Sequence, residues 1–204
     1  AEPKETKDVQ GATQTGKPTF TPGADEVPMD DDTPATFEDG SKEKVIPGEG
    51  TYTVAPDGTV TFVPEKTFTG TGTGVTVKRV DKNGTPVTAK YTPTVLPATP
   101  TATPAETTDI QGALQKGLPQ FLGGRVSVDG VQKIVPIDET KPLELIDPST
   151  GKVTNEIVVP GEGTYTVYNG VVEFRPEPQF VGKAKGVTVQ RVDVNGTPVS
   201  TTYT

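Results

Sequence analysis

The chain of 204 residues is rich in Gly (23) and Pro (21), and only 31% of it is hydrophobic. Because Pro cannot continue a helix and Gly weakens one, this composition argues against long helices. The formal net charge of −8 argues against nucleic acid as a partner, since phosphates are neutralised by clustered Lys and Arg. The absence of Cys and His from the sequence excludes the Ser/His/Asp and Cys/His catalytic arrangements and the usual zinc sites.

Two copies of one unit make up the sequence. The octapeptide Pro47–Val54 returns unchanged as Pro160–Val167, and Asn83–Val87 returns as Asn195–Val199. An internal repeat of this length indicates the domain organisation directly. The second copy is longer between its first and middle blocks, and its extra residues fall at Arg125–Gly130 and Ser149–Thr154, both loop-like in composition.

A Pro-rich segment separates the copies, with prolines at positions 93, 97, 100 and 104. Such spacing is typical of a semi-rigid, polyproline-like spacer. The expected organisation is a module over residues 1–95, a Pro/Thr/Ala-rich linker over residues 96–105 and a second module over residues 106–204. Because the first copy runs on into the linker and the second stops at Thr204, we expect a two-module part of a longer protein.

One hairpin is predicted in each copy. In the second copy, Asn169–Gly170 separates two alternating segments and indicates a type I′ turn that pairs Tyr165 with Phe174 and Val167 with Val172. Period-2 alternation then places Glu173 and Arg175 on the solvated face. In the first copy a Pro-Asp-Gly loop, closed by a left-handed Gly58, pairs Tyr52 with Phe62 and Val54 with Val60.

A second hairpin is predicted around Asn83–Gly84, with Val75–Val80 and Val87–Tyr91 as its arms, and around Asn195–Gly196 in the other copy. The alternation breaks near Lys78–Arg79, where a bulge would restore it, so the register there stays open. Short strands separated by turn signals indicate an all-β chain of two tandem antiparallel β-sandwich (Ig-like) modules joined by the Pro/Thr-rich linker.

The acidic residues give two weak candidates for a site. Asp30–Asp32 offers carboxylates of the kind that Ca²⁺ binds, but a solvated acidic loop is the alternative that we favour, and calcium binding stays open. Glu49 and Glu162 lie between glycines before a strand, where a hydrogen bond to loop backbone is favoured over acid catalysis. We expect no catalytic, cofactor-binding or metal-binding residues, no cofactor and no enzyme activity.

The blocks Pro47–Val54, Gly58–Phe62 and Val80–Pro86 together resemble the CshA-type fibril repeat of wall-anchored surface proteins in streptococci and related Gram-positive bacteria. The resemblance implies a tandem array that forms an adhesive surface fibril, extracellular and anchored in the cell wall outside this segment. It implies neighbouring repeats as partners, host matrix or microbial ligands bound by another region, and neither nucleic acid nor membrane insertion.

Two functions follow from the resemblance. The leading one is a structural stalk that projects a ligand-binding region from the cell wall. The alternative is that the repeats themselves bind a host protein or glycan during adhesion. The apolar content also differs between the copies, with 17 Leu, Ile, Val and Phe residues in 1–105 and 29 in 106–204. Since apolar burial stabilises a fold, this difference predicts a more stable second copy.

Overall fold

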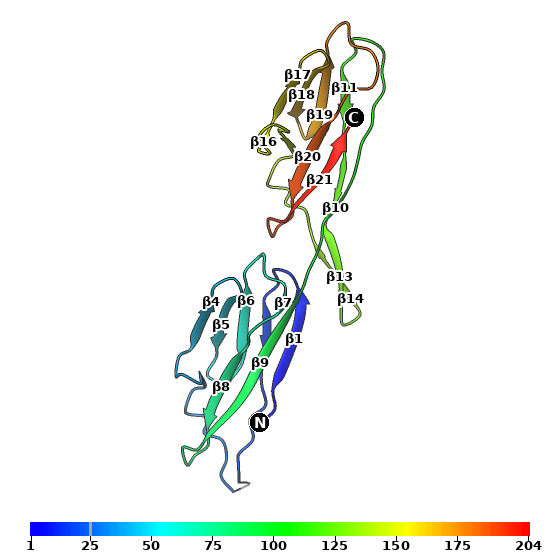
Figure 1. Ribbon diagram of the computed structural model, residues 1–204. Helices are drawn as coiled ribbons and strands as arrows, with labels where there is room; N and C mark the ends of the chain where they lie inside the picture. The colour runs from blue at the N-terminus through cyan, green and yellow to red at the C-terminus, as the bar shows by residue number, and fades with distance from the viewer. Residues whose placement is uncertain (25) are drawn as a thin grey trace. The chain divides into compact units, whose positions relative to one another are not determined.

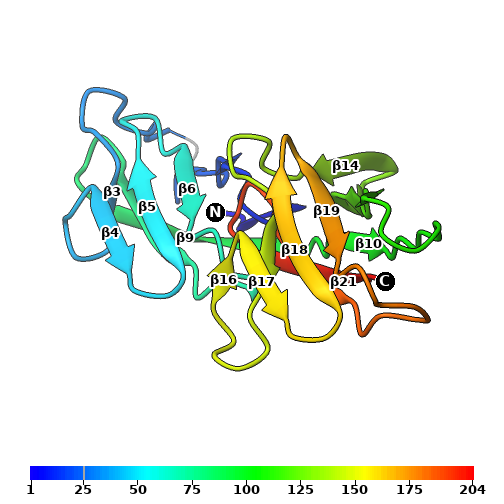
Figure 2. The same cartoon turned by 90° about the horizontal axis from the view of Figure 1, so that it is seen from above.

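The computed structural model describes residues 1–24 and 26–204. The described residues form strands and turns, and no helix among them is long and apolar enough to cross a membrane. The chain divides into two compact units: unit 1 is Ala1–Ala98 with Val126–Lys133, and unit 2 is Thr99–Arg125 with Ile134–Thr204. The predicted all-β fold is confirmed, and in each unit two sheets enclose a core (Figures 1 and 2).

Unit 1 is a sandwich of two sheets. One sheet has the order β1-β9-β8-β3, with β7 also paired to β9. The facing sheet has the order β2-β6-β5-β4. The strands are β1 (Lys4–Val9), β2 (Gln14–Gly16), β3 (Thr36–Phe37), β4 (Glu43–Ile46), β5 (Gly50–Val54), β6 (Val60–Pro64), β7 (Gly70–Thr71), β8 (Val75–Val80) and β9 (Pro86–Leu96).

Unit 2 repeats the two sheets, with the orders β11-β19-β18-β17 and β16-β15-β20-β21. One further strand pair, β10 with β12, accompanies them, whereas most of the β13–β14 hairpin, Val126–Lys133, belongs to unit 1. The remaining strands of the chain are β10 (Thr101–Thr103), β11 (Gln115–Gly117), β12 (Gln120–Leu122), β13 (Gly124–Val128), β14 (Val131–Val135), β15 (Glu144–Ile146), β16 (Val153–Thr154), β17 (Glu156–Val159), β18 (Gly163–Tyr168), β19 (Val171–Pro176), β20 (Val187–Val192) and β21 (Pro198–Tyr203).

The cores of the two units have the same aromatic centre. In unit 1, Tyr52 packs on Phe62 with ring centroids 4.5 Å apart and meets Tyr91 edge-on at 6.4 Å. In unit 2 the equivalent rings, Tyr165 with Phe174 and Tyr203, lie 4.6 and 6.3 Å apart. The rings come from both sheets, so each trio holds its sandwich together through burial and through offset or edge-to-face contact.

The predicted hairpin registers are confirmed. Tyr52 pairs with Phe62, and Tyr165 pairs with Phe174. Asn169 and Gly170 have φ values of 48° and 77°, the positive pair that a type I′ turn requires. Gly58 has φ of 95°, in agreement with the left-handed residue expected to close the other loop.

The bulge considered near Lys78–Arg79 is wrong. β8 and β9 pair without interruption from Val75 with Tyr91 to Val80 with Pro86. Arg79 takes the next inward-facing position of β8 after Val75 and Val77. Its side chain is only 10% exposed, and its guanidinium lies 5.9 Å from the centroid of the Phe20 ring. A long cationic side chain with an apolar stem can therefore occupy an inward position that the sequence pattern assigns to an apolar residue.

The prediction that Glu173 is solvated is also wrong, because this residue is only 7% exposed. Its partner across the strands is Lys116 of β11. Two cations approach its carboxylate, with Lys116 Nζ at 3.7 Å from Oε1 and an Arg175 nitrogen at 3.8 Å from Oε2. Buried carboxylates are usually paired in this way.

Three segments expected to lack regular structure contain strands. Ser149–Thr154 ends in β16, Val153–Thr154, which pairs with β15. Arg125–Gly130 belongs to the β13–β14 hairpin, and Asp129–Gly130 is its turn, with φ values of 49° and 80°. Within the expected linker, residues 96–105, Thr101–Thr103 form β10, and the Pro93–Leu96 part of the expected spacer belongs to β9. The backbone of these residues pairs with neighbouring strands, β9 with β1 and β7, and β10 with β12. This pairing holds them as strands rather than as a free polyproline-like spacer. The domain boundaries themselves stay a prediction.

One strand pair departs from the antiparallel sandwich. β1, the first strand of unit 1, runs parallel to β9, the last, from Lys4 with Tyr91 to Val9 with Leu96. Unit 2 has only an isolated parallel bridge of this kind, between Ala105 and Tyr203.

Candidate functional site

The most organised polar cluster of unit 1 surrounds Glu49, which is 7% exposed. Its Oε2 accepts a 2.6 Å hydrogen bond from the Tyr52 hydroxyl. Its Oε1 accepts 2.8 Å bonds from the backbone N–H and the hydroxyl of Thr73. The expected bond to loop backbone is thus confirmed, and the carboxylate ties the start of β5 to the loop before β8.

The counterpart Glu162 makes a looser version of this cluster. Its Oε1 accepts a 2.7 Å bond from the Lys185 N–H, and the residue is partly buried. The Tyr165 hydroxyl accepts a 3.2 Å bond from the Gly186 N–H, as Tyr52 does from Gly74. Burial raises the pKa of Tyr165 to about 12. Neither cluster brings a carboxylate together with a nucleophile in an open cleft, so both read as structural.

The acidic loops of the two units serve as ion-pair partners. Asp31 lies 2.8 Å from an Arg79 nitrogen, and Glu139 lies 3.1 Å from an Arg191 nitrogen. The Asp30 carboxylate accepts bonds from the Thr33 hydroxyl and the Asp32 N–H, which hold its pKa below the usual value. Within the described residues no three acidic side chains gather as metal ligands, so the structure brings no calcium site together at Asp30–Asp32.

A polar latch joins the terminal strands of unit 1. The hydroxyls of Thr6 and Tyr91 lie 2.6 Å apart, and the Thr6 hydroxyl donates to Gln14 Oε1 at 2.7 Å. Gln14 Nε2 donates to the Thr94 carbonyl at 2.9 Å. Gly16 permits this packing, since a Cβ there would come 2.7 Å from the Tyr91 ring. Thr107, Gln115 and Tyr203 repeat the first part of the latch in unit 2.

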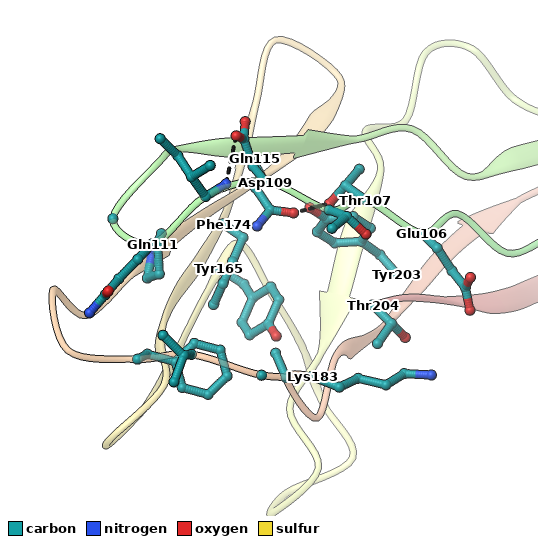
Figure 3. Close-up of a pocket in the computed structure, with 18 residues that line it drawn as sticks. Glu106, Thr107, Asp109, Gln111, Gln115, Tyr165, Phe174, Lys183, Tyr203 and Thr204 are labelled. Atoms are coloured by element: carbon teal, nitrogen blue, oxygen red, sulfur yellow. Dashed lines mark hydrogen bonds between the residues drawn. The ribbon is translucent and has the colours of Figure 1, made fainter.

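Unit 2 has a groove of about 510 Å³ beside its latch, lined on one side by Thr107–Gln111 and on the other by Gly182–Ala184. Figure 3 shows the groove between the segment of Thr107, Asp109 and Gln111 and the segment of Lys183. Tyr165, Phe174 and Phe180 form part of its lining. Neither bordering segment is a strand, and Ile110 is 78% exposed.

The equivalent space in unit 1 is filled by its own chain. Residues 93–96 continue β9 between β1 and β7, pairing Asp8 with Val95 and Gly70 with Val95. Val95 is 1% exposed and belongs to the core. Thr204 is the counterpart of Thr92, so residues 93–98 have no counterpart in the second copy of this sequence. This groove was not predicted from the sequence.

The comparisons with known proteins point to one family. The model of the surface adhesin CshA repetitive domain matches residues 1–95 and 97–204. The chain belongs to the CshA repeat family. It is similar to repeat domain 13 of the fibrillar adhesin CshA from Streptococcus gordonii, with 68% identity over 35% of this chain and 91% of that chain, and a TM-score of 0.21. The expected family is thereby confirmed, and the chain is a repeat of the surface-adhesin kind.

Other solved structures are only distantly similar to this CshA repeat pair. The N-cadherin EC1-3 structure from Drosophila is 14% identical over 98% of this chain and 62% of that chain, with a TM-score of 0.36. The titin I9-I11 tandem is 10% identical over 100% of this chain and 64% of that chain, with a TM-score of 0.35. No curated protein sequence matches the chain.

Proposed function

We propose that the two modules are stalk repeats of an extracellular surface fibril, which hold a ligand-binding region away from a cell wall and carry mechanical load. They act without catalysis, cofactor or metal. Their partners are the neighbouring repeats, and the anchor and the ligand-binding region belong to other parts of the fibril. Membership of the CshA repeat family supports this proposal.

The observation that carries the proposal is the parallel pairing of β1 with β9. Because the first and last strands of unit 1 run in the same direction, the chain enters at one end of the pair and leaves at the other. A pull on the two ends then acts along the strands and loads their hydrogen bonds together, in shear. Since each ladder bond would have to break at nearly the same time, this arrangement suits a load-bearing repeat.

The polar latch adds side-chain bonds to the same pair of strands. Thr6 of β1 joins Tyr91 of β9, and both lie in the buried space beside Gln14. A hydrogen bond contributes about 0.5–1.5 kcal/mol when both partners are satisfied. The latch therefore strengthens the contact that a pulling force would have to break.

Force spectroscopy on the chain pulled through its two ends tests the proposal. We expect Thr6→Ala to lower the unfolding force of the first module, because it removes the latch from β1. The second module serves as an internal reference, and Thr88→Ala, at an exposed position of β9, is the matched control. An unfolding force that is unchanged by Thr6→Ala would contradict a load-bearing role for this strand pair.

A binding role is the second candidate, favoured by large hydrophobic side chains on the surface. Tyr168 of β18 is 61% exposed, and Val158 of the neighbouring strand β17 is 59% exposed. Exposed apolar side chains at one surface can mark an interaction site. If the chain is a stalk, the immobilised chain should not bind matrix proteins, glycans or whole cells. Saturable binding that Tyr168→Ser abolishes would favour the alternative.

A further inference from the structure

We propose that Asn169 is a site of spontaneous covalent modification, at which the side-chain amide is converted through a cyclic imide into aspartate and isoaspartate. The inference concerns the tip of the β18–β19 hairpin and is independent of the stalk role. The sequence contains three Asn-Gly pairs, Asn83–Gly84, Asn169–Gly170 and Asn195–Gly196. All three have the residue types that this reaction needs, because a Gly without Cβ leaves its own peptide nitrogen open to approach. The local structure distinguishes the three pairs.

The reaction uses the peptide nitrogen of the Gly as its nucleophile. The Gly170 nitrogen gives up its proton to a base and forms a bond to Asn169 Cγ, while the bond from Cγ to Nδ2 breaks and Nδ2 leaves as ammonia. Water then opens the imide ring. Breaking the ring bond at Cγ leaves aspartate, whereas breaking it at the main-chain carbonyl carbon leaves isoaspartate, with the chain running through Cγ. Nothing is oxidised or reduced, and water is the co-reactant.

At Asn169 the nucleophile has no hydrogen bond to lose. Tyr168 pairs with Val171, and the hydrogen bond that closes a two-residue turn joins these flanking residues, so the Gly170 N–H stays outside the ladder. Within the described part of the chain, nothing accepts a bond from the Gly170 N–H or bonds to the Asn169 side-chain amide. Both residues are exposed. The side chain and the peptide plane can therefore turn toward each other, and a base can reach the proton.

The other two Asn-Gly pairs lie in closed loops. The Gly84 N–H donates to the Asp81 carbonyl at 2.9 Å, and Asp81 Oδ1 accepts from the N–H groups of Asn83 and Thr85 at 2.8 and 2.9 Å. The second copy repeats all three bonds around Asp193. Attack in either loop requires a local opening that breaks the Gly hydrogen bond and turns a peptide plane that the other bonds fix.

Exposure alone would rank the three sites differently. Asn83 and Asn169 are both exposed, whereas Asn195 is only 8% exposed. A reaction limited by solvent access would therefore modify Asn83 as fast as Asn169. A reaction limited by the freedom of the Gly N–H modifies Asn169 first, so Asn83 is a matched control within the same chain.

The two products should affect the hairpin differently. Aspartate fits the turn, because Asp129 of this chain has φ of 49° and Gly130 has φ of 80°, close to the 48° and 77° of Asn169 and Gly170. Isoaspartate adds a carbon atom to the main chain of a two-residue turn. Since loop length fixes hairpin register, the pairing beside the turn is then lost. We expect the second module to unfold at a lower urea concentration in chains that carry isoaspartate.

The test incubates the folded 204-residue chain at mildly alkaline pH in water labelled with heavy oxygen, and locates the label by peptide mass spectrometry. Label should enter at Asn169 several-fold faster than at Asn83 or Asn195, with release of ammonia. In urea that unfolds both modules, the three pairs should react at similar rates, because the fold no longer holds the Gly84 and Gly196 N–H groups.

Asn169→Gly is the control variant, because it removes the amide and keeps a residue that tolerates positive φ. After the same incubation it should carry no label at the hairpin, and the urea midpoint of its second module should not change. In the incubated parent chain, the fraction with isoaspartate should have a lower midpoint. Labelling of Asn83 as fast as Asn169 in the folded chain would overturn the proposal, as would a folded chain in which Asn169 stays unlabelled while the urea-unfolded chain reacts.

Discussion

At the residue scale, the two modules differ most clearly at the carboxylates Glu49 and Glu162. The sequence predicts that each carboxylate bonds to loop backbone, and both bonds exist, donated by the N–H groups of Thr73 and Lys185. The bond between Glu49 and the Tyr52 hydroxyl was not predicted, because it depends on where the buried ring lies rather than on any spacing. Identical octapeptides thus support a tight cluster in one copy and a looser one in the other.

This difference predicts unequal costs for one substitution. Glu49→Gln should destabilise the first module by about 1–3 kcal/mol, because an amide cannot accept the three bonds that the buried carboxylate accepts. Glu162→Gln is the matched control and should cost less, since Glu162 is more exposed. Urea unfolding of both variants measures this difference. Equal costs would mean that the additional bonds of Glu49, from the hydroxyls of Tyr52 and Thr73, add nothing to stability.

The buried tyrosines predict a loss of stability at alkaline pH. Burial raises the pKa of Tyr165 to about 12 and also raises the pKa of Tyr91 and Tyr203. Since the unfolded chain releases these protons near pH 10, the folded state loses stability as the pH rises from about 10 to 12 and keeps it below that range. Urea midpoints across this range should fall. Tyr165→Phe should reduce the fall, whereas Tyr168→Phe, at an exposed position, should leave it unchanged.

At the element scale, local signals predicted the hairpins and missed the long-range pairs. Asn-Gly and Pro-Asp-Gly turns fix both partners within a few residues, so Tyr52 with Phe62 and Tyr165 with Phe174 could be derived. Asp129–Gly130 carries the same kind of signal and would have revealed β13–β14. The parallel pairing of β1 with β9 joins residues over 80 positions apart, and no local pattern specifies such a register.

The type I′ turn at Asn169–Gly170 leads to a prediction about stability. Asn169→Ala should destabilise the second module by about 1 kcal/mol. Most residues with a Cβ, Ala included, are destabilised by that order at positive φ, whereas Asn tolerates this conformation better. Asn169→Gly keeps the permitted conformation and should be nearly neutral. Thermal unfolding of the two variants distinguishes them. A neutral Asn169→Ala variant would be incompatible with a turn that holds this register.

At the scale of the whole molecule, apolar content proved a poor guide to core size. Among the described residues, the exposed large hydrophobic side chains fall mainly in 106–204, among them Ile110, Leu118, Leu122 and Val181. The second copy therefore has more apolar residues without a larger buried set. Counting residues could not reveal this, because burial depends on which segments cover them.

The order of stability predicted from apolar content stays a prediction, and the burial of the side chains argues for the opposite order. We expect the second module to unfold before the first, because many of its additional apolar side chains are exposed rather than buried. Residue-specific NMR signals followed through a urea titration would separate the two transitions. A second module that outlasts the first would show that its additional apolar residues do stabilise it.

The most direct test of the load-bearing account is the dependence of unfolding force on pulling direction. The chain has no Cys, so introduced cysteines attach handles at single positions. Handles at Ala1→Cys and Pro97→Cys pull β1 and β9 in shear, whereas handles at Ala1→Cys and Asn83→Cys peel them apart from one end. We predict a clearly higher unfolding force for the first module in shear than in peeling. Equal forces in the two directions would contradict the claim that the parallel terminal strands make this module a mechanical stalk.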